Sequence, residues 1–126
     1  MPHDLLNAAQ EIAAIAKAEN TYRAVVNRSY YASYHASIEF RNALPKIGSV
    51  GGARGVHEQL IALLLNPHRK LTGGRIIKSK TVGKYLRQLC DLRANADYHL
   101  NLSVGEDVMR DAVTLAQSIF DEIYGA

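Results

Sequence analysis

Apolar residues that recur every three or four positions constrain the fold of this chain more than any other feature. The clearest run lies between Val108 and Ile123 and also contains Ala112, Leu115 and Ile119. This spacing places apolar side chains on one face of an α-helix. Similar runs recur along the chain, separated by glycines, prolines and residues that cap helices. The pattern predicts an all-α protein.

Five helices follow from these runs and the breakers between them. They are expected at about residues 4–18, 21–43, 56–65, 79–98 and from 103 to the end of the last apolar run. Asp4 is expected to cap the first helix, and Ser103 with Glu106 forms a capping box for the fifth. Short connections before the second and fifth helices imply antiparallel neighbours. The sequence therefore predicts an antiparallel up-and-down bundle of four or five helices, formed by residues 1–126 as a single domain.

Composition narrows the class of protein. Apolar residues make up 48% of the chain, which is enough for one core. Cys90 is the one cysteine, so no internal disulfide can form, and its apolar neighbours predict a buried side chain. The sequence has no recognisable targeting segment and no apolar stretch of the roughly 20 residues that a bilayer requires. A cytoplasmic protein without a membrane partner is the expectation.

Charge is unevenly distributed, although the net charge is only +3. The stretch 59–90 contains no acid and seven basic residues: Arg69, Lys70, Arg75, Lys78, Lys80, Lys84 and Arg87. The stretch from Asp91 onward contains seven acids. A basic sector of this kind can bind RNA or single-stranded nucleic acid, and Lys80, Lys84 and Arg87 form a stripe that we expect to lead towards Arg93. A solvated charged loop remains the alternative.

Polar aromatic residues cluster on the second predicted helix. Arg28, Tyr31 and His35 are spaced so that they share one face. These residues are candidates for a supporting role in a site. The alternative is a core in which buried tyrosine and histidine side chains find hydrogen-bond partners.

A second candidate cluster ends the fourth predicted helix, from Arg93 to His99. Arg93 and Asp97 are four residues apart, so the carboxylate can orient the guanidinium. Asn95 and Tyr98 could support them. The alternative is a surface ion pair together with a histidine that interacts with the helix dipole.

Taken together, three segments resemble the small stand-alone members of the HEPN superfamily. They are Arg28 to Ala36, with Tyr30, Tyr31 and His35; Val56 to Ile61, which has His57 in second place; and Leu92 to Tyr98. The likeness extends from about Thr21 to Ile123, and the order and separation of the three segments make it fairly specific.

The resemblance implies a helical bundle that often forms a homodimer. Many members are metal-independent ribonucleases, often toxins paired with a minimal nucleotidyltransferase antitoxin, and others are non-catalytic binding modules. Their hallmark is an arginine followed a few residues later by a histidine, which Arg93 and His99 match with five residues between them. Ala94 departs from the pattern, because nuclease members commonly have a polar residue after the arginine.

RNA cleavage without a metal ion requires proton transfer and positive charge at the phosphate. Histidine can supply the first and arginine the second. We therefore expect one cluster in space that contains Arg28, Tyr31, His35, Arg93, Asp97 and His99. No known cofactor motif occurs, and His57, Glu58 and His68 lack metal-ligand spacing, so neither a cofactor nor a metal is expected.

Overall fold

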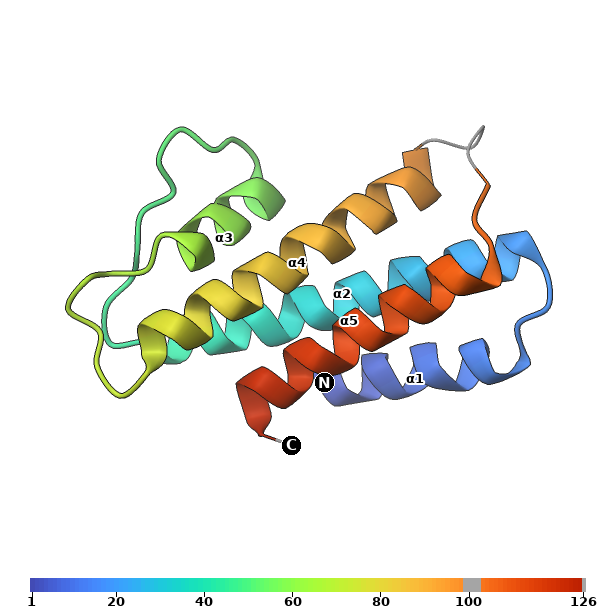
Figure 1. Cartoon of the computed structure of the whole chain (residues 1–126), viewed down its shortest axis with the longest axis horizontal. Helices are drawn as coiled ribbons and strands as arrows, with labels where there is room; N and C mark the ends of the chain where they lie inside the picture. Colours follow the sequence, from blue (N-terminus) through green and yellow to red (C-terminus); the bar gives the residue numbers. More distant parts are fainter. Residues whose placement is uncertain (99–102, 126) are drawn as a thin grey trace.

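The computed structural model describes residues 1–98 and 103–125, and in these ranges the chain forms helices and no strand. The helices, in chain order, are α1 (Pro2–Ile15), α2 (Glu19–Ala43), α3 (Val56–Leu65), α4 (Arg75–Tyr98) and α5 (Glu106–Tyr124). The expected all-α bundle is confirmed (Figure 1).

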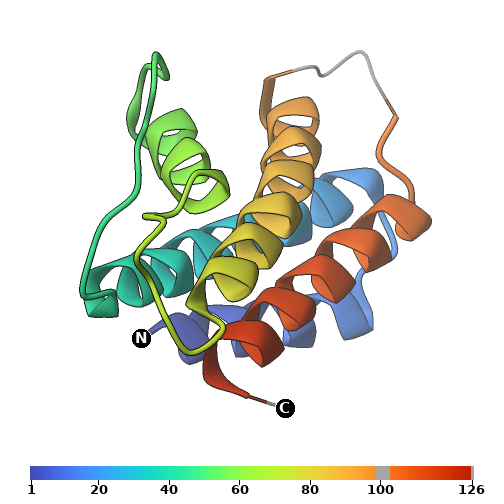
Figure 2. The same cartoon turned by 60° about the vertical axis from the view of Figure 1, so that its left-hand side comes forward.

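Helices α2 and α5 form the central pair of the four long helices. These two helices lie side by side, with α4 on one side of the pair and α1 on the other (Figures 1 and 2). Contacts at the two ends of α2 show that it runs parallel to α5: Glu19 accepts a hydrogen bond from the Val104 amide, and Glu39 accepts one from Tyr124. Helices α1 and α4 run the opposite way, which gives the expected antiparallel order along the chain.

Small side chains allow α2 to occupy the centre of the bundle. The residues that it buries completely include Ser29, Ala32, Ser33, Ala36 and Ser37. Small residues let neighbouring helices approach closely, and the Ser33 hydroxyl is satisfied within the helix because it donates to the Ser29 carbonyl at 2.9 Å. Helix α2 can therefore contact α1, α4 and α5 at once.

The shorter helix α3 packs against α4, antiparallel to it. Near the N-terminus of α3, Glu58 pairs with Arg87, and near its C-terminus the Leu64 carbonyl accepts a hydrogen bond from Ser79 at 2.7 Å. Gly83 lies where the two helices are closest, since a Cβ atom there would be 3.0 Å from the Leu65 side chain. This packing fixes both ends of α3 against the bundle.

Two predicted helix caps are not formed in the structure. Helix α1 begins at Pro2 with Met1 as its N-cap, so Asp4 lies in the first turn and does not cap the helix. Helix α5 begins at Glu106 with Gly105 as its N-cap and no side-chain cap, so the predicted capping box of Ser103 and Glu106 does not form. The Val104 amide is satisfied instead by the Glu19 carboxylate of α2.

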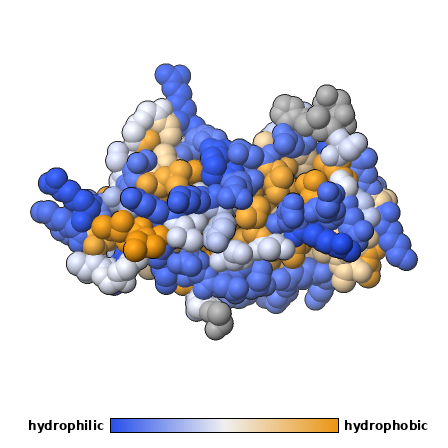
Figure 3. All heavy atoms as spheres, viewed as in Figure 1, coloured by the Kyte–Doolittle hydropathy of each residue, from blue (hydrophilic) through white to orange (hydrophobic). Residues whose placement is uncertain are grey.

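The molecular surface facing the viewer in Figure 3 is mostly hydrophilic. Apolar residues gather there between α4 and α5, where Leu92 and Leu115 line a hollow, and at the N-terminal end of α4. In the described part of the chain, no helix combines the length and the apolar character needed to cross a bilayer.

Candidate functional site

Arg93 is the centre of the candidate site. It points from α4 into the bundle and is only 6% exposed. Its guanidinium carbon lies 4.9 Å from the ring centroid of Tyr30, 5.8 Å from that of Tyr31 and 5.4 Å from that of Tyr98. Aromatic faces attract a cation at such distances. The three rings therefore hold the guanidinium in a mostly aromatic environment.

The polar partners of Arg93 satisfy it only in part. Nη1 donates to the Tyr98 hydroxyl at 3.1 Å and lies 3.8 Å from a carboxylate oxygen of Asp97. The same oxygen of Asp97 accepts a shorter hydrogen bond, at 2.9 Å, from Asn27 of α2. Nε of Arg93 is buried and has no hydrogen-bond partner in residues 1–98 and 103–125. The positive charge is thus held in place without a close bidentate partner.

His57 at the start of α3 belongs to the same cluster. Its Nδ1 atom lies 2.6 Å from the Tyr30 hydroxyl, and its ring centroid is 4.8 Å from that of Tyr34. Burial raises the pKa of Tyr30, so the phenol keeps its proton. The direction of this hydrogen bond follows the tautomer of His57, because a neutral phenol can donate to Nδ1 or accept from it.

The environment of His57 favours its neutral form. Burial lowers the pKa of the imidazole, and the charge on Arg93 lowers it further, while Glu58 acts in the opposite direction. In the tautomer whose Nδ1 donates to the phenol, Nε2 of this partly buried, neutral imidazole has a free lone pair and can accept a proton. His57 is therefore a candidate for acid–base chemistry beside Arg93.

The lowered pKa of His57 predicts a pH dependence of folding stability. The unfolded chain takes up a proton at this position as pH falls below about 6.5, whereas the folded protein resists it. The contribution of His57 to the free energy of unfolding is therefore complete above about pH 6.5, and it is lost as the pH falls from there through the pKa of the folded state. Between pH 7.5 and 5.5 the urea midpoint of the wild type should therefore fall further than that of His57→Gln.

His57→Gln isolates the effect of the titration of His57, because glutamine can keep a hydrogen bond to Tyr30 but does not titrate. Glu19 and Glu58 also have lowered pKa values, through hydrogen bonds to Arg23 and Arg87 respectively, but the stability that they contribute is lost only below about pH 4.5, outside this range. An equal fall in midpoint for the two proteins would exclude the assigned role of His57.

The structure brings together only part of the predicted cluster. Tyr31, Arg93, Asp97 and Tyr98 lie together. Arg28 and Asn95 are exposed, and neither makes a hydrogen bond or ion pair with another described residue. The half-buried His35 lies beside Tyr34, with the rings tilted and their centroids 5.6 Å apart, and it makes no hydrogen bond to Arg93. His99 lies outside the described residues, so its predicted place in the cluster stays a prediction.

The basic residues do not form the predicted continuous path to Arg93. Arg87 makes two hydrogen bonds to Glu58, at 2.5 and 3.0 Å, and one to Asp91 at 2.9 Å. Asp91 is the next residue on that side of α4, whereas Arg93 faces the core. Lys80 and Lys84 are exposed, and the ion pairs of the described residues do not include them. The other four basic residues lie just before α4 or in its first turn. Arg69 and Lys70 belong to the segment between α3 and α4, and Arg75 and Lys78 belong to α4.

The contact between Tyr30 and His57 was not predicted from the sequence. His57 appeared in the resemblance, but no role was assigned to it. A tyrosine expected on a buried face and a histidine in the first turn of the next helix were the available signals. Only the packing of α3 across α2 and α4 shows that they meet.

Comparisons with known proteins add no family assignment. No family model, curated protein or solved structure matches the chain. In residues 1–98 and 103–125, no group of three or more histidine, cysteine, aspartate or glutamate side chains is placed to hold a metal ion. The site must therefore be interpreted from its own geometry.

Proposed function

We propose that this protein is of HEPN type and acts on RNA, and that it cleaves the RNA chain without a metal ion at the Arg93 cluster. The observation that supports the proposal best is the state of Arg93. Arg93 is 6% exposed, its Nε has no partner among the described residues, and the nearest of their carboxylate oxygens is 3.8 Å away. A fixed positive charge without a close counterion favours binding of an anion such as a phosphate.

The proposed reaction uses histidine for proton transfer. One imidazole removes the proton from the RNA 2′-hydroxyl as its oxygen attacks the adjacent phosphorus, and a protonated group donates to the leaving 5′-oxygen. The resemblance assigns Arg93 and His99 to this chemistry, Asp97 orients Arg93 from the next turn of α4, and the neutral His57 provides a second imidazole. The phosphate would reach Arg93 when the Tyr98 side chain, which is 70% exposed, rotates away.

A homodimer is part of the proposal, because a second copy could supply the complementary acid or base across a shared cleft. The face of α4 that meets α5 includes a hollow lined by Leu92 and Leu115, which offers apolar area for such an interface. A minimal nucleotidyltransferase is the proposed antitoxin partner, and the proposed location is the cytoplasm.

The burial of Arg93 favours a second candidate function. A guanidinium that is enclosed by three tyrosines could serve packing alone. The protein would then be a non-catalytic HEPN module that binds nucleic acid or a nucleotidyltransferase partner.

Incubation of the pure protein with mixed RNAs in EDTA separates the two functions. We expect the wild type to cleave RNA but not single-stranded DNA of the same sequence, because DNA lacks the 2′-hydroxyl. His99→Ala should cleave about a hundredfold more slowly, the lower end of the usual contribution of acid–base catalysis. Absence of RNA cleavage by the wild type would reject the catalytic proposal in favour of the binding module.

A further inference from the structure

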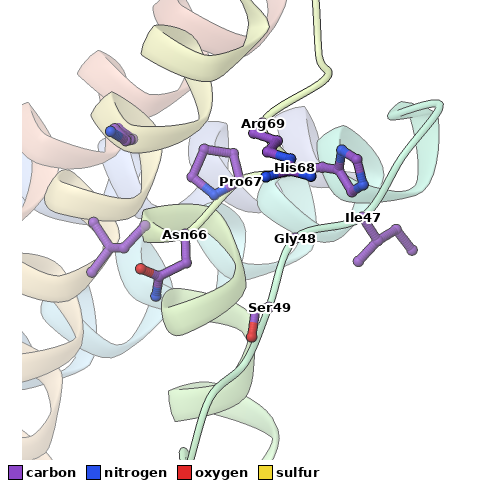
Figure 4. A pocket seen from close by; sticks show the side chains of 9 residues that line it. Ile47, Gly48, Ser49, Asn66, Pro67, His68 and Arg69 are labelled. Atoms are coloured by element: carbon purple, nitrogen blue, oxygen red, sulfur yellow. The ribbon is translucent and has the colours of Figure 1, made fainter.

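A cavity of about 580 Å³ lies at the opposite end of α3 from His57. Its walls come from the loop before α3, the turn after α3 and the second turn of α4. The lining residues are Ile47, Gly48, Ser49, Leu65, Asn66, Pro67, His68, Arg69 and Lys80 (Figure 4). A volume of this size falls in the range of small-molecule sites.

The charge of the cavity is entirely positive. No acid lines it, and Arg69 and Lys80 are exposed without an ion pair to any described residue. His68 adds a third basic group. Its Nδ1 accepts the Lys70 amide at 3.1 Å, so the neutral ring carries its proton on Nε2 as a further donor.

Carbonyl groups at the C-terminus of α3 would normally repel an anion, but here those of Ala62 and Leu64, and that of Asn66 after the helix, already accept hydrogen bonds. The Ala62 carbonyl accepts from the Asn66 backbone amide at 2.9 Å and from its side-chain amide at 2.8 Å. The Leu64 carbonyl accepts from Ser79, and the Asn66 carbonyl accepts from the Ser49 amide at 3.0 Å. The basic side chains therefore set the sign of the potential in the cavity.

The walls of the cavity are held together by close packing of backbone. The chain at Gly48 lies so close to the end of α3 that a Cβ atom there would be 2.8 Å from the Leu63 carbonyl oxygen. In Figure 4 the segment from Ile47 to Ser49 runs past Asn66 and His68. The cavity is thus a built feature of two loops, to which Ile47, Leu65 and Pro67 add apolar area.

We propose that this cavity binds the terminal phosphate of a nucleotide. A phosphate monoester carries a larger negative charge than a phosphodiester within a chain, which suits a lining with two exposed cations and a histidine N–H donor. The apolar lining can contact the attached nucleoside. The ligand can be the phosphorylated end of an RNA or a free mononucleotide.

The RNA end is the source that we favour, and this choice rests on the proposed function. Helix α3 has ten residues, so the cavity and His57 are separated by roughly 15 Å along its axis. A single strand that is anchored by its phosphorylated end in the cavity can extend along α3 towards Arg93. Glu58 would repel the phosphates of this strand less than an unpaired carboxylate would, because Glu58 forms an ion pair with Arg87.

The test uses a short 2′-O-methyl oligonucleotide, which cannot be cleaved through its 2′-oxygen, with and without a 5′-phosphate. Fluorescence anisotropy at low salt should show that the phosphate raises affinity about tenfold, which corresponds to two or three charge-assisted hydrogen bonds at partial exposure. Arg69→Ala/Lys80→Ala should abolish this preference. The matched control Lys70→Ala/Lys84→Ala removes the same charge from neighbouring exposed positions outside the cavity and should preserve it.

Adenosine monophosphate, adenosine and inorganic phosphate serve as competitors. Displacement by adenosine monophosphate but not by adenosine supports a free nucleotide as the occupant, and a preference that persists without displacement supports the RNA end. Equal binding of the two oligonucleotides by the wild type, or an equal loss of the preference in both double variants, overturns the proposal. RNA cleavage is measured separately, so a wild type that retains the phosphate preference but does not cleave rejects only the catalytic function.

Discussion

Replacement of Arg93 by methionine is expected to lower the rate of RNA cleavage about a thousandfold, the upper end of what removal of one charge-stabilising group costs. The same change should leave the free energy of unfolding unchanged or raise it. Arg93 is 6% exposed, and its Nε has no partner in the described part of the chain, so part of the cost of desolvating this group stays uncompensated in the folded state. Methionine has a similar length, tolerates an aromatic environment and removes that cost.

Opposite effects on stability and activity distinguish a functional residue from a packing residue. Arg110→Met is the matched control, because Arg110 is exposed on α5 and pairs with Glu106 at 2.7 Å. It should change the unfolding free energy by less than about 1 kcal/mol and leave cleavage intact. Urea unfolding and a cleavage assay in EDTA provide both measurements.

Two results would contradict this interpretation of Arg93. If Arg93→Met unfolds the protein, the cation is held by its three tyrosines for structural reasons, and the binding-module function gains support. If the variant is stable and cleaves RNA at the rate of the wild type, the phosphate is not held by Arg93. Both results are read from the same two assays.

Local signals in the sequence were sufficient for some helices and insufficient for others. The bounds of α3 were predicted as observed, because Gly55 precedes it and Asn66 with Pro67 follows it. The start of α4 was predicted near Ser79 or Lys80, four or five residues late. Ser79 resembles a capping residue in the sequence, but it is buried and its hydroxyl donates to the Leu64 carbonyl of α3. Its role is tertiary, so no local pattern could reveal it.

The contacts of the candidate site were predictable where both residues belong to one helix, and not where they join different helices. Spacing within one helix correctly suggested that Asp97 lies near Arg93, since both belong to α4. The hydrogen bond between Tyr30 and His57 joins residues 27 positions apart and depends on how α3 crosses the bundle. The expected position of Arg28 beside Arg93 assumed that every polar residue of that stretch faces the core, whereas Arg28 is exposed.

Gly48→Ala should destabilise the protein by about 1–3 kcal/mol, the usual cost of overpacking, although glycine-to-alanine changes in loops are often neutral or stabilising. The new methyl group would overlap the Asn66 carbonyl oxygen and lie 2.8 Å from that of Leu63. Both neighbours are backbone atoms at the end of a packed helix, so they cannot move aside as a flexible side chain can. Relief of the overlap would separate the loop from α3 and break the hydrogen bond from the Ser49 amide to Asn66.

Gly52→Ala is the control for this prediction. Gly52 belongs to the same loop, has no atom within 4 Å of the site of a new Cβ and does not have a positive φ. The unfolding free energy of Gly52→Ala should therefore match that of the wild type or exceed it by a few tenths of a kcal/mol, because alanine restricts the unfolded chain. Urea unfolding of the three proteins measures the difference. Equal stability of Gly48→Ala and Gly52→Ala would show that the loop is not packed against α3, and the cavity beside Asn66 would then lack its wall.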